Sequence, residues 1–521
     1  FVQWLFEDLI VSLIKTHFYC TEGSRCGITV FYFRKPLWAK ICLNGLKKLV
    51  ESRILRAINP ANVEKNKMPE KYTGERRSVS KLRFVPKSTG SLRPIMNLSF
   101  KARGQRYSTN QSLGNIFQAL KFEIKQNPSL AGCGIPGVAA FYDSFKAFAM
   151  RTKAYRHKVR MATSILNHDP VELYMVTLDI KSCYDNVLHK KLFDILKKVM
   201  TKDQYAVHKH MLLKYKSIGE SCPQVKFVKN VEENTAVFSF LGKAEANPKK
   251  KSCIFTDGVE WVTVTKNAIF YALRNHIEKN IVSTRIGDTE IEFNQIKGIP
   301  QGSVLSTLLC NIYYGDLEQK LIRPILEENE KKARHGGLQY LLTRLVDDFL
   351  LISTSKQTVD TFAEKLGAGF PEYGVHVNIK KTVFSTPEKP WVCWCGFKIH
   401  AQHLWVKMDH SRILATGKIS QSFTVDFSNK SISEGFVRYL TSTIALKCDP
   451  ILFDKHINPD FVIVYNLAQV FVFVGLRFEV CCKQLQFLNA ELLCTVLIRI
   501  IRYAFALIED RTNNCFCLDY N

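Results

Sequence analysis

The amino-acid sequence predicts an α+β protein with a helical C-terminal part, and three observations support this prediction. Between Lys81 and about Gly396, short runs of β-branched and other apolar residues alternate with patterns of helical period. Inside that region, Leu341–Ile352 consists of two apolar runs that are separated only by a pair of aspartates, as in a hairpin of two buried strands. From Ser411 onward, apolar residues recur at helical spacing.

The N-terminal block, residues 1 to about 50, is rich in aromatic and basic side chains. Aromatic rings interleaved with Arg and Lys suit base stacking and phosphate contact, although a basic amphipathic helix has the same composition. A polar and charged stretch follows, Glu64–Arg77, which contains Pro69 and Gly74. This composition predicts an exposed linker.

Composition and charge restrict the class of protein. A chain of 521 residues suggests several domains, and 46% hydrophobic with 12% aromatic residues exclude a wholly disordered chain. Lys and Arg number 73 against 47 acidic residues, a formal net charge of +26. Such a surplus indicates a polyanionic partner, either nucleic acid or an anionic membrane surface.

The longest apolar stretch, Phe461–Leu476, argues against a membrane partner. It spans 16 residues, contains Asn466 and Gln469, and is flanked by Asp460 and Arg477. A membrane span needs about 20 apolar residues, so this stretch predicts a buried helix. The sixteen cysteines include no Cys-x-x-Cys pair, which predicts reduced and mostly buried thiols rather than a zinc site.

Three aspartates are the strongest candidates for chemistry. Glu172–Ile180 is apolar or β-branched until Asp179, so it predicts a buried strand that ends in a carboxylate. In Leu341–Ile352 the hairpin turn would carry both Asp347 and Asp348. An Asp-Asp pair can simply favour a tight turn. Carboxylates placed between apolar strands are costly, however, and two Mg²⁺ ions would offset that cost while activating a 3′-hydroxyl and neutralising pyrophosphate.

Two further segments predict a pocket for a phosphorylated substrate. Gly298–Ser303 is a turn sequence that leads into a long helix, in which Gly302 permits close backbone approach and Ser303 would cap the helix. Leu82–Lys87 and Leu92–Ile95, joined through Gly90, predict a basic β-hairpin. Such cations can stabilise a triphosphate, although a solvated basic hairpin is equally consistent with the residues alone.

These segments resemble the motifs of a known family, the telomerase reverse transcriptases. The sequences DIKSCYDN from Asp179 and LVDDF from Leu345 resemble reverse transcriptase palm motifs, and GIPQGSVLSTLLC from Gly298 resembles the telomerase form of another. The resemblance implies a right-hand polymerase with fingers, a palm built on an antiparallel sheet and a helical thumb. It also implies two Mg²⁺ ions as cofactors, held by Asp179, the main chain of Ile180, Asp347 and Asp348.

The same resemblance assigns roles around the metal ligands. Tyr184 would lie under the sugar of the incoming nucleotide and exclude a 2′-hydroxyl, and Lys381, rather than Lys380, would protonate the departing pyrophosphate. The residues implied in nucleotide binding are Lys87, Arg93, Tyr184, Gln301 and Gly302. Trp394, Cys395 and Gly396 resemble the primer-grip motif that holds the DNA 3′ end.

Telomerase is favoured over other reverse transcriptases by the N-terminal block and by an insertion. FYCTE and FYFRKPLWAK resemble a telomerase RNA-binding motif, and Asp179 and Gly298 lie 119 positions apart, as expected for an insertion in the fingers. Ala445–Cys448 resembles part of the telomerase thumb extension. The residues implied in RNA binding are Phe18, Tyr19, Tyr32, Arg34, Lys35 and Trp38.

The resemblance implies three domains. Residues 1–75 would be the C-terminal part of an RNA-binding domain with its linker, 76–392 fingers and palm with an insertion at about 200–292, and 393–521 primer grip and thumb. The amino-terminal domain of the family and the first part of its RNA-binding domain would lie outside this chain.

The implied function is RNA-templated addition of telomeric repeats to chromosome 3′ ends. The implied partners are a telomerase RNA, single-stranded telomeric DNA, deoxynucleoside triphosphates and accessory proteins in the nucleus, at the telomere. Two other functions are consistent with the polymerase motifs: that of a retroelement or group II intron reverse transcriptase, and that of a non-catalytic RNA-binding scaffold. The insertion and Trp394-Cys395-Gly396 argue against the first, and the presence of all three aspartates argues against the second.

Overall fold

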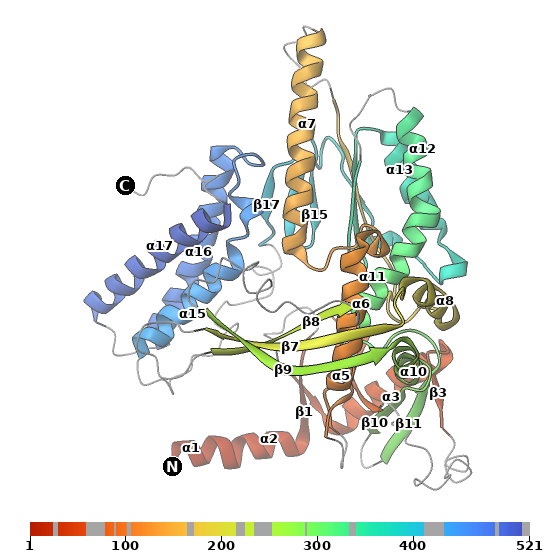
Figure 1. Ribbon diagram of the computed structural model, residues 1–521. Helices are drawn as coiled ribbons and strands as arrows, with labels where there is room; N and C mark the ends of the chain where they lie inside the picture. Colours follow the sequence, from red (N-terminus) through yellow and green to blue (C-terminus); the bar gives the residue numbers. More distant parts are fainter. Residues whose placement is uncertain are drawn as a thin grey trace.

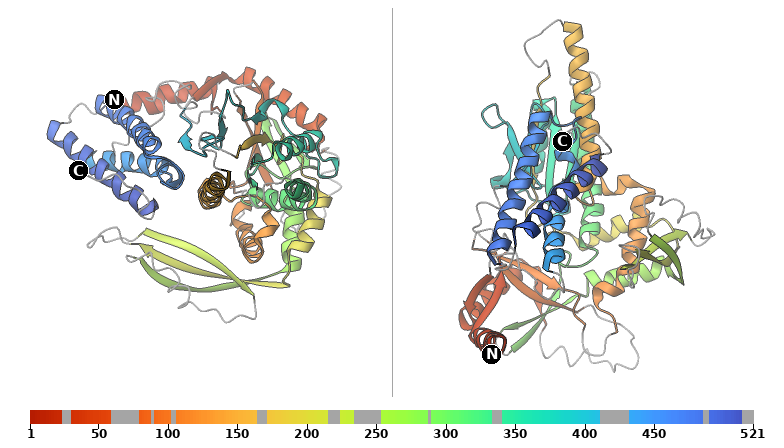
Figure 2. Two further views of the ribbon diagram at one scale, coloured as in Figure 1. Left: turned by 90° about the horizontal axis from the view of Figure 1, so that it is seen from above. Right: turned by 90° about the vertical axis from the view of Figure 1, so that its left-hand side faces the viewer.

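The computed structural model of the chain shows a mixed α+β polymerase fold (Figure 1). It describes residues 1–23, 30–58, 79–87, 90–101, 106–163, 171–214, 224–233, 253–286, 289–332, 340–410, 432–484 and 489–512. The whole of the predicted linker, residues 64–77, lies outside these described residues. Figure 2 shows helices and ribbons arranged around an open centre, with the C-terminal helices on one side.

The palm is a four-stranded sheet in the order β12-β13-β6-β14, and it carries the predicted aspartates. All of its strand pairs are antiparallel, with β13 hydrogen-bonded to both β12 and β6. Both faces of the central strands are buried because helices cover them, which explains why their sequences are apolar runs. The strands are β6 (Tyr174–Asp179), β12 (Leu341–Leu345), β13 (Asp348–Ser353) and β14 (Val383–Phe384).

Two groups of helices cover the palm sheet. One face packs into a core that includes Val176, Leu178 and Phe349, together with residues of α8, α11 and α13. The other face packs into a core that includes Met175 and Leu350, together with α7 and the thumb helices. The helices are α7 (Phe141–Thr163), α8 (His189–Val199), α11 (Ser306–Leu317), the π-helical η4 (Glu318–Ile322), α12 (Arg323–Lys332) and α13 (Lys356–Ala368). Short 3₁₀ turns are η2 (Pro128–Ala131), η3 (Val138–Ala140), η5 (Pro371–Tyr373) and η6 (Ile379–Lys381).

The fingers sheet has the order β3-β11-β10-β4-β5. Its centre is the parallel pair β10 and β4, in which Ile281 lies opposite Val79. The predicted basic hairpin is confirmed as β4 and β5, with Val85 opposite Arg93. The elements are β3 (Leu55–Ala57), β4 (Val79–Pro86), β5 (Leu92–Asn97), β10 (Ile281–Ile286), β11 (Thr289–Gln295), α5 (Thr109–Ser112), α6 (Gly114–Gln126) and α10 (Lys266–Ile277).

The segment predicted as an insertion, about 200–292, begins with a long three-stranded ribbon in the order β8-β7-β9. The ribbon passes across the lower part of the molecule in Figure 1. The end of the predicted segment instead joins the fingers sheet as β10 and the first part of β11, so the inserted unit is smaller than the predicted range. The ribbon strands are β7 (Gln204–Lys214), β8 (Gln224–Glu233) and β9 (Cys253–Thr265).

The thumb region joins a small sheet, β15-β16-β17, to three long helices. Asn466 anchors α16 to this sheet, because its side-chain amide donates to the carbonyls of Val406 and Leu452, both at 2.9 Å. The elements are β15 (Trp391–Trp394), β16 (Phe397–His400), β17 (Val406–Met408), α15 (Ile432–Lys447), the 3₁₀ turn η8 (Pro450–Leu452), α16 (Asp460–Gln484) and α17 (Ala490–Thr512).

Helix α16 corrects the prediction of a buried helix, because only one side of it is buried. Val462 and Val470 are buried, whereas Phe461 and Val472 on the other side are 61% and 58% exposed. Among the described residues it is the one helix, over Asp460–Lys483, long and apolar enough to cross a membrane, with 33% of the tested window inside the protein. Core helices of soluble proteins meet the same criterion, so this is weak evidence for a membrane span.

The N-terminal block forms a helix, a hairpin and a second helix. Its described elements are α1 (Val2–Trp4), the π-helical η1 (Leu5–Ile10), α2 (Val11–His17), β1 (Phe18–Glu22), β2 (Val30–Arg34) and α3 (Lys35–Glu51). The ion pair between Arg83 and Glu22 connects this hairpin to β4. Of the cysteines that the structure describes, Cys20, Cys393 and Cys494 are exposed and eight are buried or half-buried, so the predicted burial holds for most of them.

A buried ion pair connects α7 to the thumb and gives a test of this packing. Lys146 lies 2.7 Å from the carboxylate of Asp454, whose side chain is fully buried and also accepts from Tyr142 and from the main chain of His456. Burial raises the pKa of Asp454, but these three donors outweigh it and hold the pKa below its ordinary value.

We expect Lys146→Met to lower the free energy of unfolding by about 2 kcal/mol, because a buried carboxylate loses its countercharge while keeping two hydrogen bonds. Chemical denaturation should show this loss near neutral pH. The difference from wild type should shrink as the pH falls through the folded pKa of Asp454, because that carboxylate then becomes neutral in both proteins. Lys158→Met, at an exposed position of the same helix, should change stability by less than about 0.5 kcal/mol.

Candidate active site

The pairing of strands β6 and β13 brings the predicted aspartates together. Asp179, the last residue of β6, lies directly opposite Asp348, the first residue of β13. Asp348 in turn lies opposite Leu345 of β12, so the hairpin turn consists of Val346 and Asp347. This corrects the prediction that the turn carries both acids: Asp348 belongs to the strand, because a two-residue turn closes the hairpin one position earlier.

The turn is strained at Val346. Its φ angle is +59°, a left-handed conformation that a two-residue hairpin turn requires but that a β-branched residue rarely adopts. Such a conformation costs about 1–3 kcal/mol and persists only where the surroundings enforce it. The main-chain N–H of Ile180 donates to the carbonyl of Asp347 at 3.0 Å, which fastens the turn to the end of β6.

The charged groups around Asp347 have opposite effects on its pKa. Burial raises the pKa of Asp347 above its ordinary value, and the nearby negative charge of Asp179 raises it further, while Lys381 and Arg93 act in the opposite direction. The Lys381 ammonium lies 2.9 Å from Oδ1 of Asp179. The predicted choice of Lys381 over Lys380 therefore agrees with the position of the side chain, and its role stays a prediction.

The residues fit a divalent cation in charge, although the described residues contain no group of three or more His, Cys, Asp or Glu side chains placed to hold a metal. Two carboxylates, one at the end of a strand and one in the adjoining hairpin turn, are oxygen donors whose mutual repulsion a hard cation relieves, and burial and the first carboxylate raise the pKa of the second. Asp179 and Asp347 provide this pair. Asp348 lies beside them in the strand, and its part in binding metal remains a prediction.

The basic hairpin supplies positive charge to the same site. Lys87 and Arg93 lie on one face of the β4–β5 hairpin, since Val85 pairs with Arg93 and Lys87 follows two residues later. Burial lowers the pKa of Lys87, and the neighbouring charges of Arg93 and Lys381 lower it further, against the opposing effect of Asp185 and Asp179. These interactions place the hairpin cations within electrostatic range of the aspartates, and their part in nucleotide binding stays a prediction.

The predicted nucleotide turn packs between the hairpin and the end of β6. The carbonyl of Gln301 accepts from the main-chain N–H of Met96 in β5 at 2.8 Å, and its side-chain amide donates to Asp185 at 2.9 Å. Gly302 has a φ angle of +124°, and a Cβ there would lie 2.2 Å from the carbonyl oxygen of Met96. Only glycine permits this close approach. The ring of Tyr184, beside Asp185, is half-buried, with its hydroxyl 3.4 Å from that of Thr307.

Ser303 does not cap the following helix, which corrects that prediction. Helix α11 begins at Ser306, and Ser303 instead accepts a hydrogen bond from the main-chain N–H of Leu305 while its hydroxyl lies 2.8 Å from Nε2 of His276. Burial lowers the pKa of His276 to about 4, so the imidazole is neutral near pH 7. The intervening turn delays the helix start, because Pro300 accepts from the hydroxyl of Ser306.

The predicted primer-grip residues divide into a buried ring and a half-buried turn. The indole of Trp394 is 3% exposed, packs 4.7 Å from the ring of Phe141 and donates to the carbonyl of Asp348 at 3.2 Å. Cys395 and Gly396, with φ angles of +48° and +89°, form the two-residue turn between β15 and β16. Trp394 therefore packs against the strand that begins at Asp348 and holds it through a hydrogen bond. Of these three residues, Cys395 and Gly396 are the ones with partly exposed surface.

The predicted RNA-binding residues also divide. Trp38 is 7% exposed and stacks on Tyr19 at 4.7 Å, so these two rings hold α3 against the hairpin. Tyr32 is 59% exposed, and Arg34 and Lys35 are exposed as well. These three side chains are available to a ligand, with Phe18 half-buried at the start of β1.

Sequence reasoning missed two residues at this site. Asp185 directly follows Tyr184 and accepts from Gln301, and burial raises its pKa above the ordinary value of an aspartate. Arg344 is fully buried two residues before the strained turn, and its guanidinium donates to the carbonyl of Val346 at 3.0 Å. The signal for Arg344 was present in the sequence, since it is the one basic residue inside the apolar run Leu341–Ile352.

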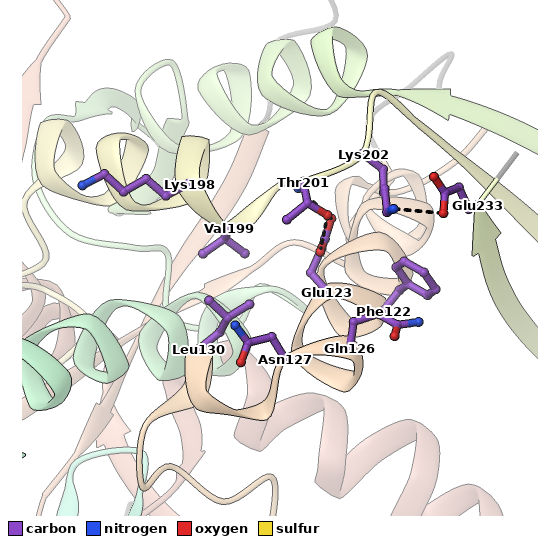
Figure 3. Close-up of a pocket in the computed structure, with 10 residues that line it drawn as sticks. All are labelled: Phe122, Glu123, Gln126, Asn127, Leu130, Lys198, Val199, Thr201, Lys202 and Glu233. Atoms are coloured by element: carbon purple, nitrogen blue, oxygen red, sulfur yellow. Dashed lines mark hydrogen bonds and ion pairs between the residues drawn. The ribbon is translucent and has the colours of Figure 1, made fainter.

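A separate pocket lies between α6, α8 and β8, away from the predicted site residues (Figure 3). Glu123 is the buried acid in it, and it accepts hydrogen bonds from the main chain and hydroxyl of Thr201 and from Tyr205. Lys202 pairs with Glu233 at 2.9 Å. Glu123 and Lys202 are thus both paired within the protein, and these contacts connect α6 to the start of the ribbon.

The fold and the site resemble those of reverse transcriptases. The family described as "Reverse transcriptase (RNA-dependent DNA polymerase)" matches residues 255–416, a span that contains the nucleotide turn, the strained hairpin and Lys381. The RNA-binding domain described for the telomerase ribonucleoprotein complex matches residues 1–49. The chain thus contains one region that matches a reverse transcriptase model and one that matches a telomerase RNA-binding model.

Its relatives are the telomerase reverse transcriptases. The chain is 28% identical to the telomerase reverse transcriptase of Mus musculus over 516 residues, 94% of this chain and 43% of that protein. It is 26% identical to the Arabidopsis thaliana protein over 541 residues, 98% of this chain and 44% of that one. The chain is thus similar in sequence to telomerase reverse transcriptases, and it spans less than half the length of these curated relatives.

A solved structure shows the same fold. The structure of telomerase from Candida albicans in complex with a fragment of telomeric RNA superposes with a TM-score of 0.66 at 18% identity. The match covers 98% of this chain and 71% of that one. The structure of apo telomerase from Candida tropicalis gives a TM-score of 0.57 at 19% identity, covering 98% and 74%.

The close approach at Gly302 gives a test of the nucleotide turn. We expect Gly302→Ala to lower the free energy of unfolding by about 3 kcal/mol, because the new Cβ would overlap the carbonyl of Met96 and the φ angle disfavours alanine. The matched control is Gly367→Ala in α13, where a Cβ meets open space and should stabilise the helix by about 0.5 kcal/mol. Equal stabilities of the two variants in denaturant titrations would show that the turn does not pack against β5.

Proposed function

We propose that this chain is the catalytic core of a telomerase, an RNA-directed DNA polymerase that extends single-stranded telomeric DNA by copying a bound telomerase RNA. The observation that carries the proposal is the pair Asp179, at the end of β6, and Asp347, in the adjoining turn, with the cations Lys87, Arg93 and Lys381 nearby. The sequence relationship to telomerase reverse transcriptases supports the choice of substrates. The nucleus, at the telomere, is the corresponding location.

Each residue has a defined part in this proposal. Asp179 and Asp347, with the main chain of Ile180 and with Asp348, would hold two Mg²⁺ ions, which activate the primer 3′-hydroxyl and neutralise the departing pyrophosphate. Lys87 and Arg93 bind the triphosphate from the fingers hairpin. Lys381 donates a proton to pyrophosphate, and Gln301 and Gly302 shape the floor of the nucleotide pocket against Asp185 and Met96.

The parts around the site complete the proposal. Residues 1–75 contribute RNA binding through the exposed side chains Tyr32, Arg34 and Lys35. Residues 76–392 form the fingers and palm, and 393–521 the primer grip and thumb. The turn Cys395-Gly396 holds the primer end, while Trp394 fixes that turn to the strand of Asp348. The formal charge of +26 suits the two nucleic acid strands that this arrangement must hold.

Asp347→Ala tests the metal site. We expect it to reduce extension of a telomeric primer by about 1,000-fold or more, because one of the two carboxylates that bind the metal is lost. Binding of the RNA, measured by filter retention, should change by less than about twofold. The control Asp194→Ala, at an exposed position of α8, should extend the primer normally. Extension by Asp347→Ala at the wild-type rate would refute the assignment.

Tyr184→Ala tests the choice of sugar. We expect the preference for deoxynucleotides over ribonucleotides to fall by about 10- to 100-fold, because the ring no longer obstructs a 2′-hydroxyl. Competition between labelled dGTP and GTP during primer extension measures this ratio. Tyr184→Phe keeps the ring and should keep the preference. A ratio that is the same in the Ala and Phe variants would place the steric barrier elsewhere.

A further inference from the structure

Arg344 is fully buried in the palm, and all three nitrogens of its guanidinium donate hydrogen bonds. Nε donates to the carboxylate of Glu318, which is 4% exposed, and Nη1 donates to Oδ1 of Asn311 at 3.1 Å. Nη2 donates to the carbonyl of Ala131 at 3.3 Å. Burial lowers the pKa of Arg344, but the charge of Glu318 outweighs it, so the guanidinium stays charged in the interior.

The energetics of such a pair do not explain its presence. Burying two charges costs desolvation that their mutual attraction repays only in part, and apolar residues of similar volume fill such a position equally well or better. An arginine with a planar fork of five donors is retained where several acceptors must be held in one geometry. The contacts of Arg344 therefore indicate which acceptor groups the structure must hold in fixed relative positions.

One of those acceptors belongs to the strained turn. Nη1 donates to the carbonyl of Val346 at 3.0 Å, and Val346 is the residue with a φ angle of +59°. Asp347 follows it directly. The guanidinium thus fixes the peptide group between Val346 and Asp347, which sets the direction in which the aspartate side chain leaves the turn.

The opposite side of the network is fixed to helix α11 and to the segment before η3. Glu318 also accepts from the main-chain N–H of Cys133 at 2.6 Å, and Arg344 exchanges strand-like hydrogen bonds with Cys133 and Ile135. Glycines make room for it: a Cβ on Gly134 would lie 2.8 Å from Nη2 of Arg344, and one on Gly315 would lie 2.3 Å from the carbonyl of Leu130. The guanidinium is therefore held rigidly on the side away from the turn.

We propose that Arg344 is a positioning residue, which holds the Val346 carbonyl and thereby keeps Asp347 directed toward Asp179. The inference rests on the proposed function, since it concerns the same carboxylate pair. Glu318 and Asn311 act through Arg344 by fixing its plane. The position of Asp347 thus depends on a hydrogen bond from the interior of the palm to the main chain of Val346, as well as on the pairing of the neighbouring strands.

The experiment uses Arg344→Lys, which keeps a positive charge beside Glu318 but lacks the fork that reaches Glu318 and Val346 together. We expect the kcat of primer extension to fall by about 10- to 100-fold, because misplacement of a reacting group by about 1 Å has effects of that size. The KM for deoxynucleotides and the affinity for RNA should change by less than about threefold. Binding of Mn²⁺ to the protein without nucleotide, followed by electron paramagnetic resonance, should weaken by about tenfold.

The second variant is the double substitution Arg344→Lys with Val346→Gly. Glycine adopts a φ angle of +59° without strain, so the turn no longer depends on the arginine to enforce that conformation. We expect at least a fivefold recovery of kcat and of Mn²⁺ affinity relative to Arg344→Lys alone. A purely structural loss would not be repaired by a glycine, which by itself adds flexibility.

Lys146→Met, which breaks the other buried ion pair described above, is the control for lost stability. At a temperature where it and Arg344→Lys are equally folded, it should retain wild-type kcat and Mn²⁺ binding. Equal losses in the two variants, or wild-type kcat and Mn²⁺ binding in Arg344→Lys, would overturn the proposal. If the wild-type protein copied no RNA template but Arg344→Lys still weakened Mn²⁺ binding, the proposed function would fail and the positioning role would stand.

Discussion

The architecture depends on one constraint, which is that two carboxylates must remain close together inside a protein. Strand β13 lies between β12 and β6, and its register places Asp348 against Asp179 and leaves Asp347 in the adjoining turn. Repulsion and desolvation oppose this arrangement, as the raised pKa of Asp347 shows. Cations from the fingers hairpin and from the turn that carries Lys381 oppose this repulsion, while the buried guanidinium of Arg344 holds the main chain of the Val346-Asp347 turn.

Much of this site could be predicted because its local signals are strong. The strand that ends at Asp179 and the hairpin around Asp347 are apolar runs interrupted only by charge, and the β4–β5 hairpin has a turn and basic residues at fixed spacing. Gly302 was predicted to allow a close approach, and it does so against Met96. In each case the property depends on a few neighbouring residues, which a single sequence displays.

The errors concern properties that arise only when distant segments meet. The extent of the turn at Val346 depends on the pairing register, the burial of Trp394 depends on Phe141, and the start of α11 depends on Pro300 and His276. The role of Arg344 could not be predicted from the sequence, because its partners Asn311 and Glu318 lie in α11 and η4, distant from it in the chain. A charged residue in an apolar run is a visible signal, but only the fold shows what that residue holds.

The parallel pairing of β4 with β10 has a consequence for how the chain is made. Ser80 lies beside Asn280 in the folded fingers sheet, yet 200 residues separate them in the sequence. At a translation rate of about 5–20 residues per second, β4 leaves the ribosome about 10–40 s before its central partner exists. During that interval the strand has an unpaired edge of the kind that promotes association with other chains. The fingers sheet of a nascent chain therefore cannot be completed until residue 286 has emerged.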